Sequence, residues 1–372
     1  MKVIFVNNYP MDGAWELWKK REFPAHHLWG ATQLQEYGID VDILPHEKFR
    51  FSKTLSNKIK LLGDLDQQIR ILFRKPDYDL VYSAHDLTTS LLALLRSVGI
   101  FRKPVVAIMH RSFNDNFFGS LFVHLFVNKH DRLICLSSRI RDQLRDRFGV
   151  SEKKMCVIEW AIDLSFYKYE SSNGASSTQY EATESRIFIS VGKTGRDYQT
   201  LIEAFDGINY SLKIYGVEKN ILPASDLPTN VTLPASEGKS NSFLPFDELL
   251  KEYQRAYVIT IPLDIPPQKV DTVTLIGLTS LLEAMAMGKA VIMTRNRQIG
   301  IDVEKEGIGI FVEPGDVEGW KKAISYLGTH PEIALEMGHR ARQLCEGKYD
   351  LKNFAAKLAG FLKETINTCT SI

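Results

Sequence analysis

Short apolar runs recur along the whole chain, with stretches of helical periodicity between them. Runs of this kind are typical of strands that are buried on both faces of a parallel sheet. In the first half such strands are predicted at 3–6, 41–44, 80–82, 104–109, 132–136 and 155–158. In the second half they are predicted at 187–191, 211–215, 231–233, 257–261, 290–294 and 310–312. The alternation therefore predicts an α/β fold built from two doubly wound, Rossmann-like units.

The length and one polar stretch divide the chain. A length of 372 residues exceeds a comfortable single core. Residues 169–185 are rich in Gly and Ser and show no apolar periodicity, which indicates a linker or mobile loop. We therefore expect an N-terminal domain over 1–168 and a C-terminal domain over 186–350. Helical patterns fill the intervals at 26–37, 87–97, 117–129, 138–148, 197–206, 247–255, 279–287, 316–327, 331–346 and 351–367.

The charge balance excludes some partners and favours others. The formal net charge is only +1, so we expect no nucleic-acid partner. The two halves differ, because residues 1–165 hold 24 Lys and Arg against 19 Asp and Glu. A basic first half suits an anionic acceptor or a membrane surface, although a chance imbalance of surface charges explains it equally well.

Cysteine usage and apolar run lengths bear on the compartment. Cys135 and Cys156 sit in apolar runs and are expected to be buried free thiols, which favours a reducing compartment. The chain opens as a strand, not as a signal peptide, and no apolar run reaches about 18 residues. We expect a cytoplasmic location. The basic and apolar stretch 48–62 would suit peripheral contact with the inner face of a membrane, but a core-facing helix with solvated lysines competes with this interpretation.

A Gly-bounded helix in the second half has the pattern of a ligand site. Gly277 precedes Leu278, Thr279 and Ser280, and Glu283 follows one turn later. Unpaired N–H groups at a helix start attract anions, and a carboxylate one turn in can accept from two sugar hydroxyls. This combination suits a nucleoside diphosphate-sugar. An ordinary crossover helix with a polar first turn fits the same residues.

Two further candidates follow predicted strands, where ligands of open α/β sheets bind. Lys193 and Arg196 lie in a loop in which Gly192 and Gly195 let the backbone turn tightly, and they can neutralise a diphosphate leaving group. A basic loop whose Arg196 pairs with a carboxylate is the alternative. His110 ends another strand and can contact a substrate hydroxyl, although a lone histidine there is often structural.

Several common sites have no pattern here. The histidines do not show metal-type spacing, so we expect no metal and no cofactor. Gly-x-Ser-x-Gly and Gly-x-Gly-x-x-Gly are both absent, which disfavours an α/β-hydrolase and a dinucleotide dehydrogenase.

With these residues in view, the chain resembles the retaining glycosyltransferases of family 4, of the exopolysaccharide and glycolipid-assembly kind. The segment 280–292 is similar to the family's Leu-Leu-Glu-Ala-Met-Ala-x-Gly-x-Pro-Val signature, and 190–205 resembles its diphosphate-binding element with the Arg and Lys exchanged. The segments 307–316 and 156–166 also resemble family motifs. Leu275 stands where the family has the first Glu of its Glu-x7-Glu motif, and Asp264 and Asp271 are the candidates to replace that Glu. Asp12-Gly13-Ala14 replaces the usual Gly-Gly of the first loop, and Trp160-Ala161 replaces Asn-Gly.

The resemblance implies the GT-B fold, in which two Rossmann-like domains face each other across a cleft and the last helix, 351–372, returns to the N-terminal domain. It implies transfer of a hexose, with glucose expected, from a UDP-sugar to a saccharide or lipid-linked saccharide. The expected catalytic residues are His110, Lys193 and Arg196. The expected nucleotide-sugar-binding residues are Gly13, Gly192, Gly216, Leu275, Gly277, Leu278, Thr279, Ser280 and Glu283. A non-catalytic nucleotide-sugar-binding scaffold of the same fold is the alternative that Leu275 motivates.

Overall fold

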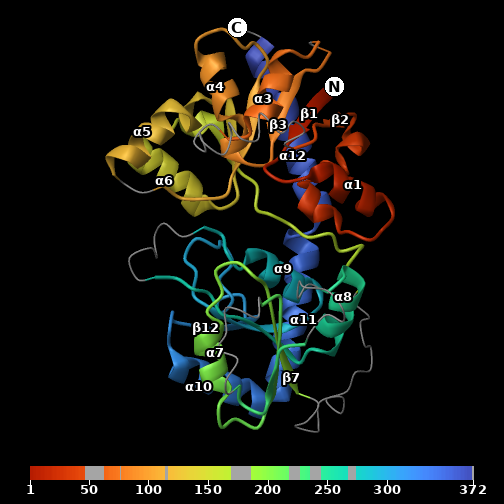
Figure 1. Cartoon of the computed structure of the whole chain (residues 1–372), viewed down its shortest axis with the longest axis vertical. Coiled ribbons are helices and arrows are strands. Elements are labelled where there is room, and N and C mark those ends of the chain that lie inside the picture. The colour runs from red at the N-terminus through yellow and green to blue at the C-terminus, as the bar shows by residue number, and fades with distance from the viewer. Residues whose placement is uncertain are drawn as a thin grey trace. The chain divides into compact units, whose positions relative to one another are not determined.

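The computed structural model describes residues 1–46, 63–75, 77–113, 116–168, 186–217, 227–234, 244–266 and 274–370. The chain forms two compact units, Met1–Asp163 with Leu351–Ile372, and Leu164–Asp350 (Figure 1). The predicted linker 169–185, the basic stretch 48–62 and Asp271 lie outside the described residues.

The first unit contains a six-stranded parallel sheet with the order β2-β1-β3-β4-β5-β6. Its strands are β1 (Lys2–Val6), β2 (Asp40–Ile43), β3 (Leu80–Ser83), β4 (Val105–Met109), β5 (Arg132–Cys135) and β6 (Met155–Val157). The central strand β4 is buried along its whole length. Burial on both faces explains why the sequence shows continuous apolar runs here in place of alternation.

Helices cover this sheet. They are α1 (Met11–Lys19), α3 (Leu65–Leu72), α4 (Ser90–Ser97), α5 (Phe117–Leu125), α6 (Ser138–Phe148) and α12 (Leu351–Thr370), with short 3-10 helices η1 (Ala25–Leu28), η2 (Leu34–Tyr37), η4 (Asp86–Thr89), η5 (Val127–Lys129) and η6 (Glu152–Lys154). The steps from β3 to β6 all run in one direction across the sheet. Because such crossovers are right-handed, α4, α5 and α6 cover the same face. Figure 1 shows α5 and α6 side by side, and the two helices are in contact.

The last helix of the chain packs in the first unit. The N–H of Leu351 donates to the carbonyl of Ile162 at 2.9 Å. Gly30 has φ +77°, and a Cβ there would lie 3.1 Å from the side chains of Phe354 and Leu358. This glycine therefore serves both a left-handed turn and the close approach of α12.

The second unit contains another six-stranded parallel sheet, in the order β12-β11-β10-β7-β8-β9. Its strands are β7 (Ile187–Val191), β8 (Ser211–Tyr215), β9 (Val231–Thr232), β10 (Val258–Ile261), β11 (Ala290–Thr294) and β12 (Gly309–Val312). Its helices are α7 (Tyr198–Phe205), α8 (Phe246–Arg255), α9 (Leu278–Ala286), α10 (Val317–Thr329) and α11 (Pro331–Lys348). Phe188, Phe205 and Trp320 are buried in its core.

All twelve predicted strands are present, and the two sheets confirm the predicted α/β fold class. The predicted helix over 26–37 is wrong. Trp29 and Gly30 both have positive φ, and this break leaves only the 3-10 turns η1 and η2. The helices α1 and α3 were not predicted. All four cysteines are free, but Cys156 is half-buried and so less enclosed than expected.

Among the described residues, none of the helices is both long enough and apolar enough to cross a membrane.

Candidate functional site

The loop after β7 in the second unit carries two glycines with positive φ, Gly192 at +138° and Gly195 at +61°. A side chain at Gly192 would collide with the guanidinium of Arg196, whose Cζ would lie 2.7 Å from the added Cβ. Gly216, which follows β8 with φ +89°, approaches the same loop, because its Cβ would lie 3.2 Å from the Gly192 carbonyl oxygen. Glycine at these positions thus lets backbone and guanidinium stack tightly at the carboxyl end of the sheet.

Arg196 joins this loop to the first turn of α9. Its Nη2 donates to the hydroxyl oxygen of Ser280 at 2.9 Å, and its Nη1 donates to the carbonyl of Thr194 at 2.9 Å. Its Nε is buried and has no hydrogen-bond partner among the described residues. Burial lowers the pKa of the Arg196 guanidinium, although the group stays charged at neutral pH. A fixed cation with an unsatisfied donor lies beside the start of a helix, an arrangement that favours an anion.

Gly277 allows the start of α9 to turn sharply, with φ +89° and no side-chain cap. The N–H of Leu278 donates to the carbonyl of Leu275 at 3.1 Å, so that this donor is already used. Helix geometry leaves the N–H groups of Thr279 and Ser280 without intrahelical acceptors. The positive end of the helix dipole is therefore available next to Arg196.

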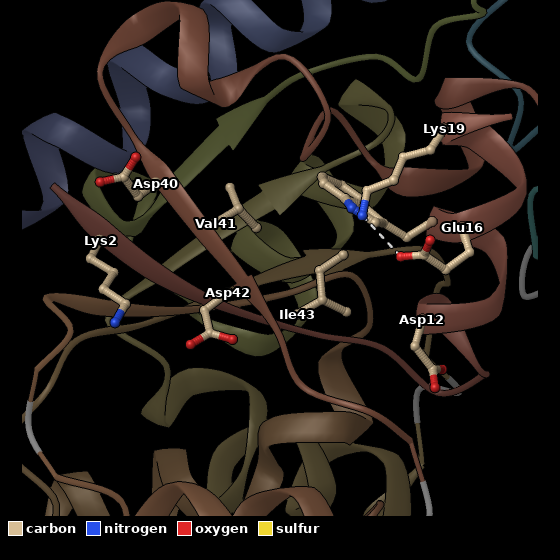
Figure 2. A pocket seen from close by; sticks show the side chains of 9 residues that line it. Lys2, Asp12, Glu16, Lys19, Asp40, Val41, Asp42 and Ile43 are labelled. Atoms are coloured by element: carbon tan, nitrogen blue, oxygen red, sulfur yellow. Dashed lines mark hydrogen bonds and ion pairs between the residues drawn. The ribbon is translucent and has the colours of Figure 1, made fainter. Parts of the chain in front are cut away.

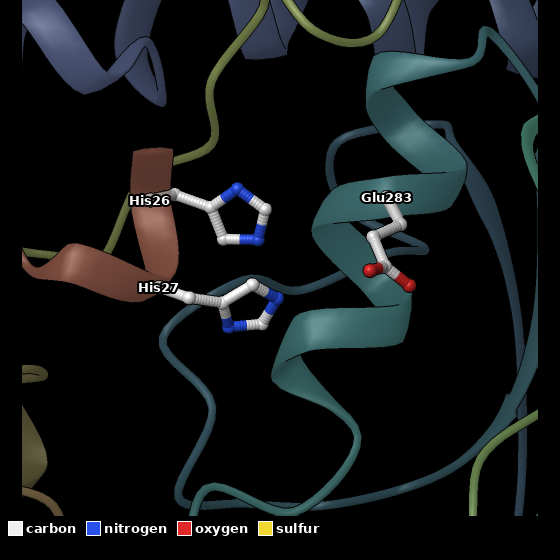
Figure 3. Close-up of side chains that lie close together, drawn as sticks. All are labelled: His26, His27 and Glu283. Atoms are coloured by element: carbon white, nitrogen blue, oxygen red, sulfur yellow. The ribbon is translucent and has the colours of Figure 1, made fainter. Parts of the chain in front are cut away.

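Glu283 lies one turn into α9 (Figure 3). Its side chain is almost fully buried. Tyr167 donates its hydroxyl to Oε1 at 3.0 Å, and Tyr253 of α8 donates to Oε2 at 2.9 Å. Burial raises the pKa of Glu283, and the two tyrosine hydroxyls oppose that rise. Each carboxylate oxygen keeps a further lone pair, so the oriented carboxylate can still accept a ligand hydroxyl.

In the first unit, His110 follows β4 and is fixed by three neighbours. Its Nε2 is hydrogen-bonded to the carbonyl of Ala84, its ring meets the Trp29 ring edge-on at 4.6 Å, and it stacks on His85 at 5.3 Å. Burial lowers the pKa of His110 to about 4, so the ring is neutral at neutral pH. A carbonyl can only accept, so Nε2 carries the proton and Nδ1 is left as an acceptor.

A groove of about 480 Å³ lies elsewhere in the first unit, between α1 and the edge strand β2 (Figure 2). Its charged lining residues are Asp12, Glu16, Asp40, Asp42, Lys2 and Lys19. Lys19 is paired with Glu16 at 2.9 Å. Four carboxylates against two lysines repel a diphosphate, so this groove is unsuited to a nucleotide.

The comparisons with known proteins connect these features to a family. Residues 25–166 match the sequence model of Glycosyltransferase Family 4. Over the whole chain, the structure is similar to solved GT-B glycosyltransferases. The chain therefore has the GT-B fold, and its first unit is similar in sequence to Glycosyltransferase Family 4.

Three solved structures illustrate the similarity of fold. HepE from Anabaena in complex with UDP-glucose has a TM-score of 0.64 and 15% identity, with 98% of this chain and 100% of HepE covered. Sucrose-phosphate synthase from Thermosynechococcus elongatus has a TM-score of 0.68 and 16% identity, with 99% of each chain covered. WaaG, a glycosyltransferase involved in lipopolysaccharide biosynthesis, has a TM-score of 0.61 and 12% identity, with 97% of this chain and 99% of WaaG covered. No curated protein matches the sequence itself.

The second unit brings together most of the residues that the sequence singled out. Gly192, Gly216, Arg196 and Ser280 meet directly, and Glu283 lies on the same helix as Ser280. Lys193 is exposed in the loop between β7 and α7.

The other predicted residues are placed differently. Leu275 is half-buried just before α9, and its carbonyl occupies the N–H of Leu278. Gly13 lies inside α1, where the sequence suggested a loop. Asp264, the candidate substitute for the missing Glu, is exposed, and its N–H donates to the carbonyl of Gly195 at 3.0 Å.

Sequence reasoning missed the two tyrosines that hold Glu283. They lie 116 and 30 residues from it, and no local pattern connects them. It also missed the partners of His110. The adjacent His85 was noted in the sequence only as a poor metal candidate, and its stacking depends on the pairing of β3 with β4.

Proposed function

We propose that this protein is a glycosyltransferase that moves a hexose, with glucose as the first candidate, from a UDP-sugar to a saccharide or lipid-linked saccharide, with retention of configuration. The observation that carries the proposal is the link between Arg196 and Ser280, which sets a half-buried cation against the open N–H groups at the start of α9. Support for the donor comes from HepE, whose solved complexes contain UDP and UDP-glucose. Support for a glycolipid or polysaccharide acceptor comes from WaaG, through its role in lipopolysaccharide biosynthesis.

Each residue has a role in this reaction. Arg196, exposed Lys193 and the N–H groups of Thr279 and Ser280 neutralise the charge that develops on the departing diphosphate. Glu283 accepts from the ribose hydroxyls. His110, neutral and with its Nδ1 open, accepts from a hydroxyl of the transferred sugar and positions it.

The chemical step is a front-face substitution. The bond between the anomeric carbon and the phosphate oxygen breaks while the acceptor oxygen bonds to the same face of that carbon. The departing phosphate oxygen takes the proton of the acceptor hydroxyl, so UDP is released with that proton on its terminal phosphate. Two side-chain cations supply the counter-charge that a divalent metal supplies in other phosphate-transferring sites, so no metal is required.

The test is release of UDP from UDP-glucose by the pure protein, with and without a panel of saccharide acceptors and with and without EDTA. Slow release of UDP and free glucose without acceptor, faster release with a suitable acceptor and no loss with EDTA are the expected results. Full loss with EDTA, restored by Mg²⁺ or Mn²⁺, would overturn the metal-free step. Tight UDP binding with no turnover across the panel would favour the non-catalytic scaffold. That alternative is motivated by Leu275, which stands in place of the Glu of the family motif.

A further inference from the structure

Helix α5 of the first unit turns its apolar side chains outward. Phe117 is 74% exposed, Phe118 78%, Leu121 42% and Leu125 37%. At about 100° per residue, these four positions fall on one arc of about 100°. A helix of a soluble domain normally buries such a stripe against the core, whereas the stripe of α5 faces the solvent.

Val123, on the face of α5 opposite the stripe, is buried, and the side next to the stripe is firmly packed. The Phe122 ring lies 5.7 Å from the Phe113 ring and 5.3 Å from the Phe126 ring. The Arg111 guanidinium lies over the Phe113 and Phe122 rings at 5.0 and 5.3 Å. At the start of the helix, the Asn116 side chain accepts from the N–H of Gly119 at 2.8 Å. These contacts prevent the helix from rotating its exposed stripe inward.

The exposed apolar side chains are concentrated in one unit. Among the described residues, the second unit exposes a single large apolar side chain, Tyr326, while the first unit exposes nine. Four of these nine form the stripe on α5. Scattered exposed apolar residues need no explanation, but a contiguous stripe of two phenylalanines and two leucines does.

The stretch of sequence that contains this helix carries a positive net charge. Residues 86–154, which run from η4 to η6, hold 12 Lys and Arg against 6 Asp and Glu. The rest of 1–165 holds 12 against 13, so the whole positive excess of the first half lies in this stretch. Helix α6, which contacts α5, carries Arg139, Arg141, Arg145 and Arg147 against Asp142 and Asp146. Arg141 pairs with Asp142, and Arg145 pairs with Asp142, Asp146 and Glu152, whereas Arg139 and Arg147 are exposed.

Apolar and aromatic side chains together with arginines suit the surface of an anionic bilayer, which has an acyl-chain region and a charged headgroup region. The apolar side chains enter the boundary of the acyl chains, and the arginines meet the charged headgroups. A second copy of the chain would present the same positive charge and be repelled. We propose that the outward face of α5, made of Phe117, Phe118, Leu121 and Leu125, binds the surface of an anionic lipid membrane.

Sedimentation of the full-length protein with vesicles tests this surface without any requirement for turnover. Vesicles of phosphatidylcholine with about one third phosphatidylglycerol should bind the protein, and pure phosphatidylcholine should bind it at least about tenfold more weakly. The double variant Phe117→Ser/Phe118→Ser should lose about tenfold or more of the affinity for anionic vesicles. The matched control is Tyr326→Ser in the second unit, where an exposed aromatic ring is removed and binding should not change.

A second double variant, Leu121→Ser/Leu125→Ser, should weaken binding as well and guards against misfolding of the first. Absence of binding by the unmodified protein would overturn the proposal. So would equal binding by the unmodified protein and both double variants. If light scattering shows a dimer that Phe117→Ser/Phe118→Ser abolishes, the stripe is a contact between copies and the membrane assignment is wrong.

Discussion

Arg196 is the residue on which the proposed diphosphate site depends most. Removing it takes away both a half-buried charge and the link to Ser280. One such contact to a developing anion is worth roughly 2.7–4 kcal/mol, so Arg196→Ala should lower kcat about 10²–10³-fold. We expect Lys193→Ala to act in the same direction. Arg340→Ala, an exposed arginine paired with Glu336 on α11, is the control and should leave UDP release unchanged. Normal turnover of Arg196→Ala would remove this residue from the mechanism.

Glu283 makes a second prediction at the residue scale, about pH. An ordinary glutamic acid has a pKa of about 4.3. Burial raises the pKa of the Glu283 carboxyl above its ordinary value, so this carboxyl takes up a proton at a higher pH. If the carboxylate holds the ribose, uridine affinity should fall as pH drops through this raised pKa. Tyr253→Phe removes a hydroxyl that stabilises the charged form, so the loss should begin at higher pH still. Calorimetry of uridine binding from pH 4.5 to 8 measures this shift.

Two variants serve as controls for Glu283: the same residue changed to glutamine, and an exposed glutamate elsewhere changed to glutamine. Glu283→Gln should bind uridine about tenfold more weakly at neutral pH and should lose the acid limb, because a charge-assisted hydrogen bond is worth about 1.5–3 kcal/mol. Glu248→Gln, at an exposed position on α8, should behave like the unmodified protein. Affinity for uridine that does not depend on pH in any variant would mean that Glu283 only holds Tyr167 and Tyr253 in place.

At the scale of elements, the turn between β7 and α7 makes a prediction that separates strain from function. Gly192→Ala forces a side chain into a left-handed backbone and into the Arg196 guanidinium. Gly207→Ala, at φ +74°, has similar backbone strain but no atom within 4 Å. Each should lose about 1–2 kcal/mol of stability in chemical denaturation, whereas only Gly192→Ala should weaken UDP binding measured by calorimetry. Equal UDP affinities for the two variants would contradict the stacking of Arg196 on this turn.

Elements also show why sequence reasoning succeeds in one place and not in another. Buried parallel strands need apolar side chains on both faces, so central strands such as β4 and β10 leave a visible run. Helix α3 leaves none, because two of its buried residues are polar: Gln67 donates its Nε2 to the Leu44 carbonyl, and Gln68 accepts from the Leu91 N–H. The long helix predicted over 26–37 fails at Trp29 and Gly30, whose positive φ cannot be read from apolar spacing. The site follows the same division: Arg196 and Glu283 lie in recognisable motifs, whereas the tyrosines come from distant segments.

At the scale of the whole molecule, the chain closes its first unit with its last helix. Seven apolar side chains of α12 are buried: Leu351, Phe354, Ala355, Leu358, Ala359, Phe361 and Leu362. Burial of one large apolar side chain contributes about 1.5–3 kcal/mol, whereas a domain as a whole is stable by about 5–15 kcal/mol. The first unit therefore depends on residues that are synthesised after the entire second unit. The sheet of the first unit cannot reach full stability until the chain is complete.

Leu358→Ala tests this dependence, since Leu358 is fully buried beside Gly30. Loss of a buried leucine costs about 2–5 kcal/mol, and the cost should appear only in the unit that contains the helix. Hydrogen exchange should show faster exchange for the amides of β1 and β3, and unchanged exchange for those of β7 and β10. Lys357→Ala, on the exposed side of the same helix, should change neither set. If Leu358→Ala instead accelerates exchange equally in both sheets, the two units unfold as one, and the stability of the nucleotide site is coupled to the end of the chain.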